Sequence, residues 1–304
     1  MSSAPLLLQA AAAAAGSQQF PAGALYVVAT PIGNLADLSL RAIHVLSLVD
    51  AVACEDTRHS APLLRHLGLD KPLIALHQHN EHEAAGAVLA RLARGERVAY
   101  VSDAGTPAIS DPGAVLVAAV QQAGHRTVPI PGASSAAAAL SVAGDAAGEG
   151  FGFVGFLPPR GAERTAAVQA CAAAAGTQVL FEAPHRIEAL AQSLADACGT
   201  RRLTACRELT KQFETVHTLA VADFPAWLAE DANRSRGEFV LVLHALPRRE
   251  ADDDEAAHDA TLRTLMAAVP LKQAVALAGE LTGAPRNALY KRALRLQRQM
   301  GADA

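Results

Sequence analysis

The chain is poor in cysteine, aromatic residues and charge, and these shortages exclude several classes of protein. Its 304 residues are 4% aromatic and 18% charged. The four cysteines, Cys54, Cys171, Cys198 and Cys206, form no C-x-x-C pair, which argues against a zinc ribbon or a dithiol redox motif. So few cysteines in a long chain indicate a reducing compartment, and we expect the cytoplasm. Every apolar stretch of about 18 residues contains charged residues or helix breakers, so we expect no membrane span.

A hydrophobic content of 51% is enough for a sizeable core and excludes wholesale disorder. The length predicts about two domains. The net charge of −4 is uninformative, because residues 252–255 supply four negative charges and leave the rest of the chain neutral. A nucleic-acid partner is therefore judged segment by segment.

The N-terminal stretch is rich in alanine. Residues 6–15 resemble a signal-peptide core, but no Lys or Arg precedes them. We expect a disordered leader over residues 1–23.

From residue 24 onward, apolar β-rich runs alternate with helical patterns. The expected strands are residues 25–29, 51–54, 73–76, 98–101 and 127–130, with helices over 38–48, 61–67, 83–94 and 112–123. This alternation predicts an N-terminal α/β domain, residues 24–144, with a mostly parallel sheet. Ligands bind outside the carboxyl ends of such strands. The loops 30–34, 55–58, 102–107 and 131–135 all lie there, so together they predict a site.

A second α/β domain is expected over residues 145–246. Its strands are 151–156, 179–182, 203–207, 215–221 and 239–243, and its helices are 162–175 and 187–197. The strands 203–207 and 215–221 are too close for a helical crossover, so they predict an antiparallel hairpin and a mixed sheet.

The C-terminal end predicts an acidic linker, residues 247–258, and a small helical tail resembling a helix-turn-helix, residues 259–304. Its last helix is basic and contains no acidic residue. This helix is either a solvated surface or an RNA contact, and its basic residues are Arg286, Lys291, Arg292, Arg295 and Arg298.

The loop 30–34 lacks G-x-G-x-x-G and a following Lys-Ser/Thr, so dinucleotide and P-loop sites are weakly supported. A ligand without phosphate, such as S-adenosylmethionine, fits better. The histidines at 77, 79 and 82 do not form a standard zinc arrangement, and we expect no metal site.

Two charged segments are candidates for chemistry. Glu55, Asp56 and Arg58 end a strand at the expected site and form either a catalytic group or a structural salt bridge. Lys211 and Glu214 lie at the predicted hairpin, where a solvated hairpin is the alternative. Arg186 begins a helix, where it either recognises an anion or makes a local salt bridge.

Taken together, several stretches resemble the tetrapyrrole methylase superfamily, and within it the small-subunit ribosomal RNA 2′-O-methyltransferase I group. They are LYVVATPIGNLADLSLRA (25–42), CEDTRHS (54–60), YVSDAGTPAISDPG (100–113), VPIPGASSAAAAL (128–140), FVGFLP (153–158), FEAPHRI (181–187), CRELTKQFET (206–215) and GEFVLVL (237–243). The match spans about residues 24–244.

The resemblance implies two α/β domains, S-adenosylmethionine as cofactor, and a homodimer. It implies methylation of the ribose 2′-hydroxyl of a cytidine in the decoding region of 16S ribosomal RNA in the small subunit. The cofactor contacts that it implies are Pro31, Asp103, Ala104, Gly105, Thr106, Pro131, Gly132, Ala133, Ser134, Phe156, Ala183, Pro184 and Gly237. Thr30 to Asn34 stand where many members carry G-x-G-P-G-D, so this loop faces either cofactor or substrate.

The chemistry is then an in-line methyl transfer to a ribose oxygen, which needs positioning and a proton acceptor. Our first candidate for the proton acceptor is Asp56 or Glu55, with Arg58 as its partner. Lys211 with Glu214 is the competing candidate. RNA phosphates need cationic contacts, which we assign to Arg160, Arg164 and Arg186, with Lys211 and the basic tail helix. The alternatives are a tetrapyrrole or precorrin methyltransferase and a non-catalytic RNA- or ribosome-binding protein.

Overall fold

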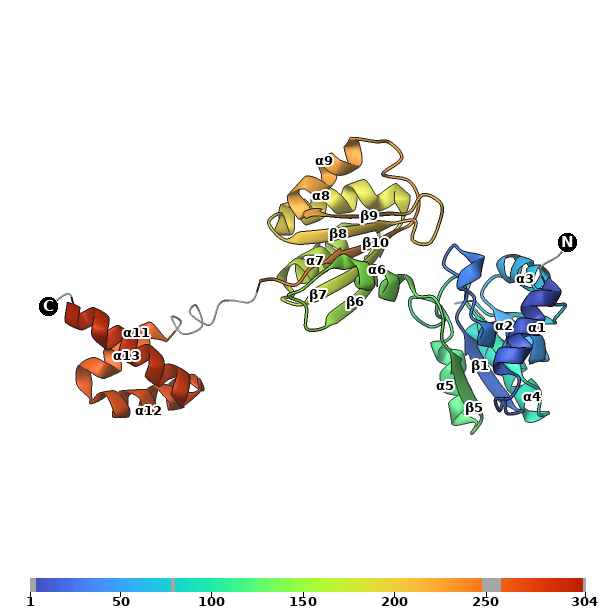
Figure 1. Ribbon diagram of the computed structural model, residues 1–304, viewed down its shortest axis with the longest axis horizontal. Helices are drawn as coiled ribbons and strands as arrows, with labels where there is room; N and C mark the ends of the chain where they lie inside the picture. The colour runs from blue at the N-terminus through green and yellow to red at the C-terminus, as the bar shows by residue number, and fades with distance from the viewer. Residues whose placement is uncertain (1–3, 78–79, 248–257, 303–304) are drawn as a thin grey trace. The chain divides into compact units, whose positions relative to one another are not determined.

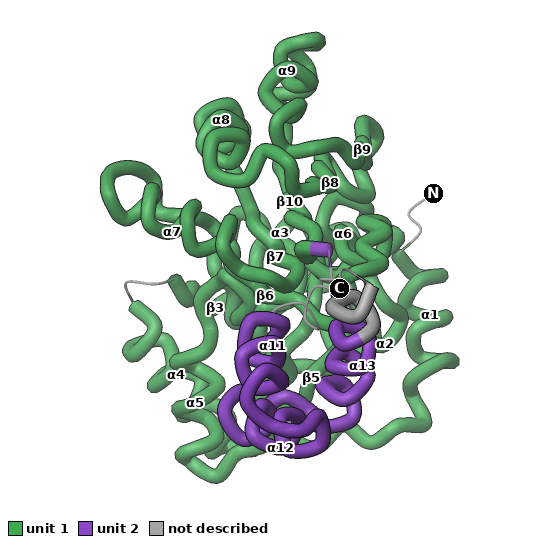
Figure 2. Tube along the Cα trace, turned by 90° about the vertical axis from the view of Figure 1, so that its left-hand side faces the viewer, with its two compact units in different colours: residues 1–246 green, residues 247–304 purple. Residues whose placement is uncertain are grey.

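The computed structural model describes residues 4–77, 80–247 and 258–302, with side chains as far as residue 297. These residues form two compact units, residues 1–246 and 247–304 (Figure 2). The larger unit contains two sheets, each in its own α/β lobe (Figure 1).

The first sheet is entirely parallel. Its strands β1 (Ala24–Val28), β2 (Ala51–Cys54), β3 (Leu73–Ala75), β4 (Val98–Val101) and β5 (Arg126–Ile130) lie in the order β3-β2-β4-β1-β5. All residues of β2 and β4 are buried, which explains their continuous apolar runs. The order places β1 beside β4, so the loops that follow these two strands are neighbours.

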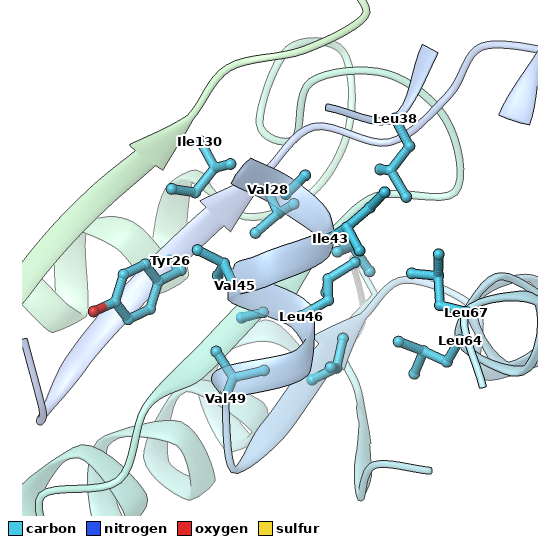
Figure 3. Close-up of a cluster of buried hydrophobic side chains, with 14 of the residues drawn as sticks. Tyr26, Val28, Leu38, Ile43, Val45, Leu46, Val49, Leu64, Leu67 and Ile130 are labelled. Atoms are coloured by element: carbon cyan, nitrogen blue, oxygen red, sulfur yellow. The ribbon is translucent and has the colours of Figure 1, made fainter. Parts of the chain in front are cut away.

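Helices cover both faces of this sheet. On one face, α2 (Leu40–Leu48) and α3 (Thr57–His66) join a core with the strands, and on the other face α4 (Glu81–Ala93) and α5 (Ala114–Gln122) do so. Ile43, Val45 and Leu46 of α2 lie over Tyr26 and Val28 of β1 (Figure 3). The apolar residues of α2 recur at the helical period, which is why that face is buried.

The N-terminal segment differs from the expected disordered leader. Residues Ala4–Ala15 form helix α1, in which Ala11 and Ala15 are buried, and Leu7 and Leu8 pack against the first core. The alanines allow α1 to pack closely against α2. Burial of this face supplies the ordering free energy that composition alone did not reveal.

The second sheet is mixed, as predicted. It contains β6 (Phe151–Phe156), β7 (Thr177–Glu182), β8 (Arg202–Arg207), β9 (Thr215–Ala220) and β10 (Phe239–Leu243), in the order β6-β7-β10-β8-β9. The pair β6 and β7 is parallel and the other pairs are antiparallel. The predicted hairpin of β8 and β9 is confirmed.

Helices α7 (Gly161–Ala173), α8 (Ile187–Cys198) and α9 (Phe224–Ala229) cover one face of this sheet. Helix α6 (Ser135–Ala143) covers the other, and Ile32 from the loop after β1 joins the same core. Short 3-10 turns precede α2, α8 and α9 at Leu35–Asp37, Pro184–Arg186 and Val221–Asp223. The α/β fold class with two sheets is confirmed.

The smaller unit is helical. It contains α11 (Asp259–Ala268), α12 (Leu271–Thr282) and α13 (Arg286–Ala302) around a core that includes Leu262, Val275 and Leu289. Gly283 ends α12 with a positive φ of 71°. The predicted helical tail is confirmed, whereas residues 248–257 of the predicted acidic linker lie outside the described residues.

Candidate active site

The loops that follow β1 and β4 are joined where the two strands end. The backbone N–H of Thr30 donates to the carbonyl of Gly105 over 2.8 Å, and that of Gly105 donates back over 3.1 Å. The buried Thr30 hydroxyl also lies 3.2 Å from the Ser102 carbonyl oxygen. The two loops therefore form one rigid wall at the carboxyl edge of the sheet.

One side of this wall borders a cavity of about 300 Å³, to which both lobes contribute. Its lining consists of Ala104, Gly105, Thr106, Ile109, Ser110, Asp111, Ser134, Ser135, Phe156, Phe181, Glu182, Ala183, Pro184, Glu238, Phe239 and Val240. Hydroxyls, three phenylalanines and three carboxylates are present, and none of these lining residues is Lys, Arg or His. Such a cavity suits a cationic ligand with an aromatic group and does not suit a phosphate.

Glu182 lines this cavity from the end of β7. Its side chain is fully buried, and its carboxylate lies 3.2 Å from Nη2 of Arg164 and 3.0 Å from Nε of Arg186. It also accepts a hydrogen bond from the backbone N–H of Ala183, over 3.0 Å. Two cations thus compensate the buried charge, and Glu182 positions the loop that leads into Pro184.

Burial affects another carboxyl of the lining. It raises the pKa of Asp111, and the charge of Asp103 acts in the same direction against a hydrogen bond from Ser102. Ala108 and Ser110, in the same loop, adopt positive φ angles of 64° and 68°. Strained backbone of this kind clusters at functional sites.

A second cavity, of about 270 Å³, borders the other side of the wall. Its lining consists of Thr30, Pro31, Gly33, Leu35, His59, Ser60, Pro62, Leu63, His66, Ser102 and Asp103. Nδ1 of His59 lies 2.9 Å from Oδ2 of Asp103 in this lining. Because Asp103 directly precedes Ala104, a single loop serves both cavities.

The structure divides the predicted cofactor residues into three groups. Those that line the first cavity are Ala104, Gly105, Thr106, Ser134, Phe156, Ala183 and Pro184. Pro31 and Asp103 line the second cavity. Outside both linings are Pro131, Gly132, Ala133 and Gly237.

Several lining residues of the first cavity are not among the site residues expected from the sequence, such as Asp111, Phe181 and Glu182. All three lie within stretches that carry the family resemblance, which was the available signal. His59 of the second cavity lies in the same kind of stretch, CEDTRHS, and was not selected either.

The first set of candidate catalytic residues is mainly engaged in ion pairing. Asp56 caps α3 by accepting from the Arg58 backbone N–H, and its Oδ2 lies 2.6 Å from Nη2 of Arg58. The hydrogen bonds from Arg58 hold the pKa of Asp56 down, at about 2. Burial and the neighbouring carboxylates Asp103, Asp111 and Asp56 raise the pKa of Glu55 instead. Asp56 is therefore a weak proton acceptor, and Glu55 is the stronger base of the two.

The competing set lies in the segment between β8 and β9. Nζ of Lys211 lies 2.9 Å from a carboxylate oxygen of each of Glu208 and Glu238. The Glu214 carboxylate accepts from the backbone N–H of Thr210 over 2.6 Å. The stem of Lys211 also passes directly over Gly33, so this segment holds the loop after β1 in place.

The predicted RNA contacts differ in availability. Arg164 and Arg186 are largely buried against Glu182. Arg292 is bound to Asp259, with its Nε 2.7 Å from Oδ1. Arg160, Arg286, Lys291 and Arg295 are exposed, and the side chain of Arg298 lies outside the described part of the structure.

Within the described residues, no group of three or more His, Cys, Asp and Glu side chains is arranged to hold a metal ion. Of the histidines at 77, 79 and 82, the one at position 79 lies outside the described residues. None of the helices described is long and apolar enough to cross a membrane.

Comparison with known proteins defines the class. Residues 24–225 match the family of Tetrapyrrole (Corrin/Porphyrin) Methylases, and residues 252–297 match the RsmI C-terminal HTH domain. A solved structure of uroporphyrin-III C-methyltransferase from Thermus thermophilus, complexed with S-adenosyl homocysteine, has the same fold, with a TM-score of 0.52 at 16% identity. It covers 72% of this chain and 96% of that one.

The most informative relatives are similar over nearly the whole chain. Ribosomal RNA small subunit methyltransferase I of Pseudomonas aeruginosa is 47% identical over 91% of this chain and 98% of its own length. The protein of that name from Escherichia coli O157:H7 is 45% identical over 90% of this chain and 96% of its own. The chain therefore belongs to the tetrapyrrole methylase family, and within it to the ribosomal RNA small subunit methyltransferase I group.

Proposed function

We propose that the protein transfers a methyl group from S-adenosylmethionine to the ribose 2′-hydroxyl of a cytidine in the decoding region of 16S ribosomal RNA. The similarity to ribosomal RNA small subunit methyltransferase I over nine tenths of the chain carries this proposal. The exposed cations of α13, on a unit that matches the C-terminal domain of the same group, favour an RNA substrate over a small molecule.

The first cavity fits the proposed cofactor. S-adenosylmethionine supplies an electrophilic methyl group on a positively charged sulfur and carries no phosphate. The carboxyl group of Asp111 favours that positive charge, and the rings of Phe156 and Phe181 offer surfaces for the adenine. Glu182 keeps the Ala183–Pro184 side of the cavity in place.

The resemblance also implies where the protein acts and in which oligomeric state. We expect a homodimer that acts in the cytoplasm on the small ribosomal subunit.

The test is transfer of radiolabelled methyl to small ribosomal subunits that lack their own 2′-O-methyl groups. Naked 16S RNA and a tetrapyrrole precursor serve as parallel acceptors. We expect label in the ribosomal samples. Label in the tetrapyrrole alone would instead support a metabolic methyltransferase, and absence of cofactor binding would support a non-catalytic RNA-binding protein.

A further inference from the structure

The second cavity adjoins the first across the wall formed by the two loops, and neither cavity is enclosed. Asp103 lines the second cavity and Ala104, the next residue, lines the first. The paired backbone of Thr30 and Gly105 fixes this wall. A nucleotide bound in the second cavity must therefore place its ribose at the open edge of this wall to reach a ligand in the first.

His59 and Asp103 form a dyad in the second cavity. Nδ1 of His59 lies 2.9 Å from Oδ2 of Asp103, and Oδ1 of the same carboxylate accepts from the Asp56 backbone N–H over 3.1 Å. Both oxygens of Asp103 are thus anchored. When Nδ1 donates its proton to Asp103, Nε2 keeps a lone pair, and the His59 side chain is 66% exposed. A histidine oriented by a carboxylate in this way is a common proton acceptor.

The other lining residues suit a nucleoside. Pro31, Pro62 and Leu63 offer apolar surface for a base, while the exposed His66 offers a hydrogen-bonding group. A volume of about 270 Å³ gives room for a single base and its ribose. Enzymes that act on a nucleobase extrude that nucleotide into such a pocket, and the same arrangement would fix the position of a ribose.

We propose that the second cavity binds the nucleobase of the acceptor nucleotide and that the ribose 2′-hydroxyl extends past the open edge of the wall to the methyl group in the first cavity. His59, oriented by Asp103, is then the base that removes the ribose proton. This inference rests on the proposed function. The ribose oxygen forms a bond to the methyl carbon, and the carbon–sulfur bond breaks with its electron pair on sulfur. The hydroxyl proton goes to Nε2 of His59, and the resulting imidazolium beside Asp103 later releases it to water.

The competing acceptors are less suited to this role. Asp56 is bound to Arg58. Glu55 is absent from the lining of the second cavity and instead lines a more open one, which shares Asp103 with it.

The test compares single-turnover methyl transfer to small subunits by the wild-type protein, His59→Ala and Glu55→Gln, with saturating cofactor and enzyme. We expect His59→Ala to lower the rate by roughly a hundredfold to ten-thousandfold, as for loss of a general base. Its affinity for S-adenosylmethionine, measured by calorimetry, stays within about twofold. Added imidazole restores part of the rate, which a purely structural role for His59 would not allow. His82→Ala, at an exposed histidine of α4 outside both cavities, is the matched control and keeps the wild-type rate.

A His59→Ala rate within about threefold of wild type would overturn the inference. So would a large loss in Glu55→Gln without one in His59→Ala. If the wild-type protein itself transfers no methyl to the subunit, the proposed function fails, and this result is distinct from failure of the dyad. Thermal unfolding of each variant establishes that it is folded.

Discussion

Oδ2 of Asp56 lies 2.6 Å from Nη2 of Arg58, two residues along the chain, where the Asp56 carboxylate also caps helix α3. The two groups that the sequence offers as a base and its partner are therefore bound to each other. The pair lies at the start of the helix that carries His59.

The first prediction concerns Asp56. Asp56→Asn keeps a capping side chain and loses the charge, whereas Asp56→Ala loses both. We expect Asp56→Asn to retain methyl transfer within a few-fold of wild type, and Asp56→Ala to unfold at a lower temperature. Turnover assays and thermal unfolding check this, and loss of turnover in a stable Asp56→Asn protein would restore Asp56 as the base.

The same pair predicts a pH dependence of stability. The hydrogen bonds from Arg58 lower the pKa of Asp56 from 3.8 to about 2 in the folded protein. A carboxyl with a depressed folded pKa stabilises the fold above its unfolded pKa, and this stabilisation is lost as the pH falls toward the folded value. We therefore expect the difference in stability between wild type and Asp56→Asn to shrink between pH 3.8 and about 2. A difference that stays constant across this range would contradict the ion pair.

A second prediction concerns the close approach of Lys211 to Gly33. Gly33 has a φ of 149°, and a Cβ at this position would collide with the Lys211 stem. Gly33→Ala should therefore displace Lys211 from Glu208 and Glu238 and loosen the loop after β1. We expect lower methyl transfer at saturating cofactor, measured as single-turnover rate.

Gly95→Ala is the matched control, because Gly95 also has a positive φ, of 82°, but has open space where a Cβ would lie. Both variants carry backbone strain, and only Gly33→Ala carries the collision. Equal losses of transfer in the two variants would attribute the effect to strain alone.

The buried carboxylate of Glu182 gives a third prediction. Glu182→Gln leaves Arg164 and Arg186 without their common counter-charge in a buried setting. Loss of one partner from a buried ion pair costs about 3–5 kcal/mol, so we expect a decrease of that order in the free energy of unfolding. Denaturant titration measures it.

The loop at Ala183 should also move in Glu182→Gln, which predicts weaker binding of S-adenosylmethionine by calorimetry. Glu188→Gln, at an exposed position in the first turn of α8, is the control and should change stability by less than about 0.5 kcal/mol. If Glu182→Gln has the stability of the wild type, the ion pairs of Glu182 with Arg164 and Arg186 are not required for the fold.

A fourth prediction separates two neighbouring cations of α13. Lys291 is exposed, whereas Arg292 is bound to Asp259 within the smaller unit. We expect Lys291→Ala to weaken binding to the small subunit and to reduce its salt dependence by about one released ion. Arg292→Ala should mainly lower the thermal stability of the smaller unit. The same salt dependence in Lys291→Ala and wild type would exclude a phosphate contact at Lys291.

The alternation of apolar strands and helical patterns was sufficient to predict both sheets, because buried parallel strands and amphipathic helices have distinct periods. Helix α1 was missed because its order comes from contact with α2, which composition does not encode. The site was predicted as a set of loops on one edge. The contacts between its side chains could not be predicted from the sequence. His59 and Asp103, for example, are 44 residues apart and meet only because β2 lies beside β4 in the sheet.

The proposed methylation of a cytidine ribose is tested most directly by the chemical identity of the methylated nucleoside. Small subunits treated with the protein and labelled S-adenosylmethionine are digested to nucleosides, which are separated and identified by mass spectrometry. We expect label on the ribose of cytidine, as 2′-O-methylcytidine. Label on a base, or on the ribose of another nucleoside, would contradict it.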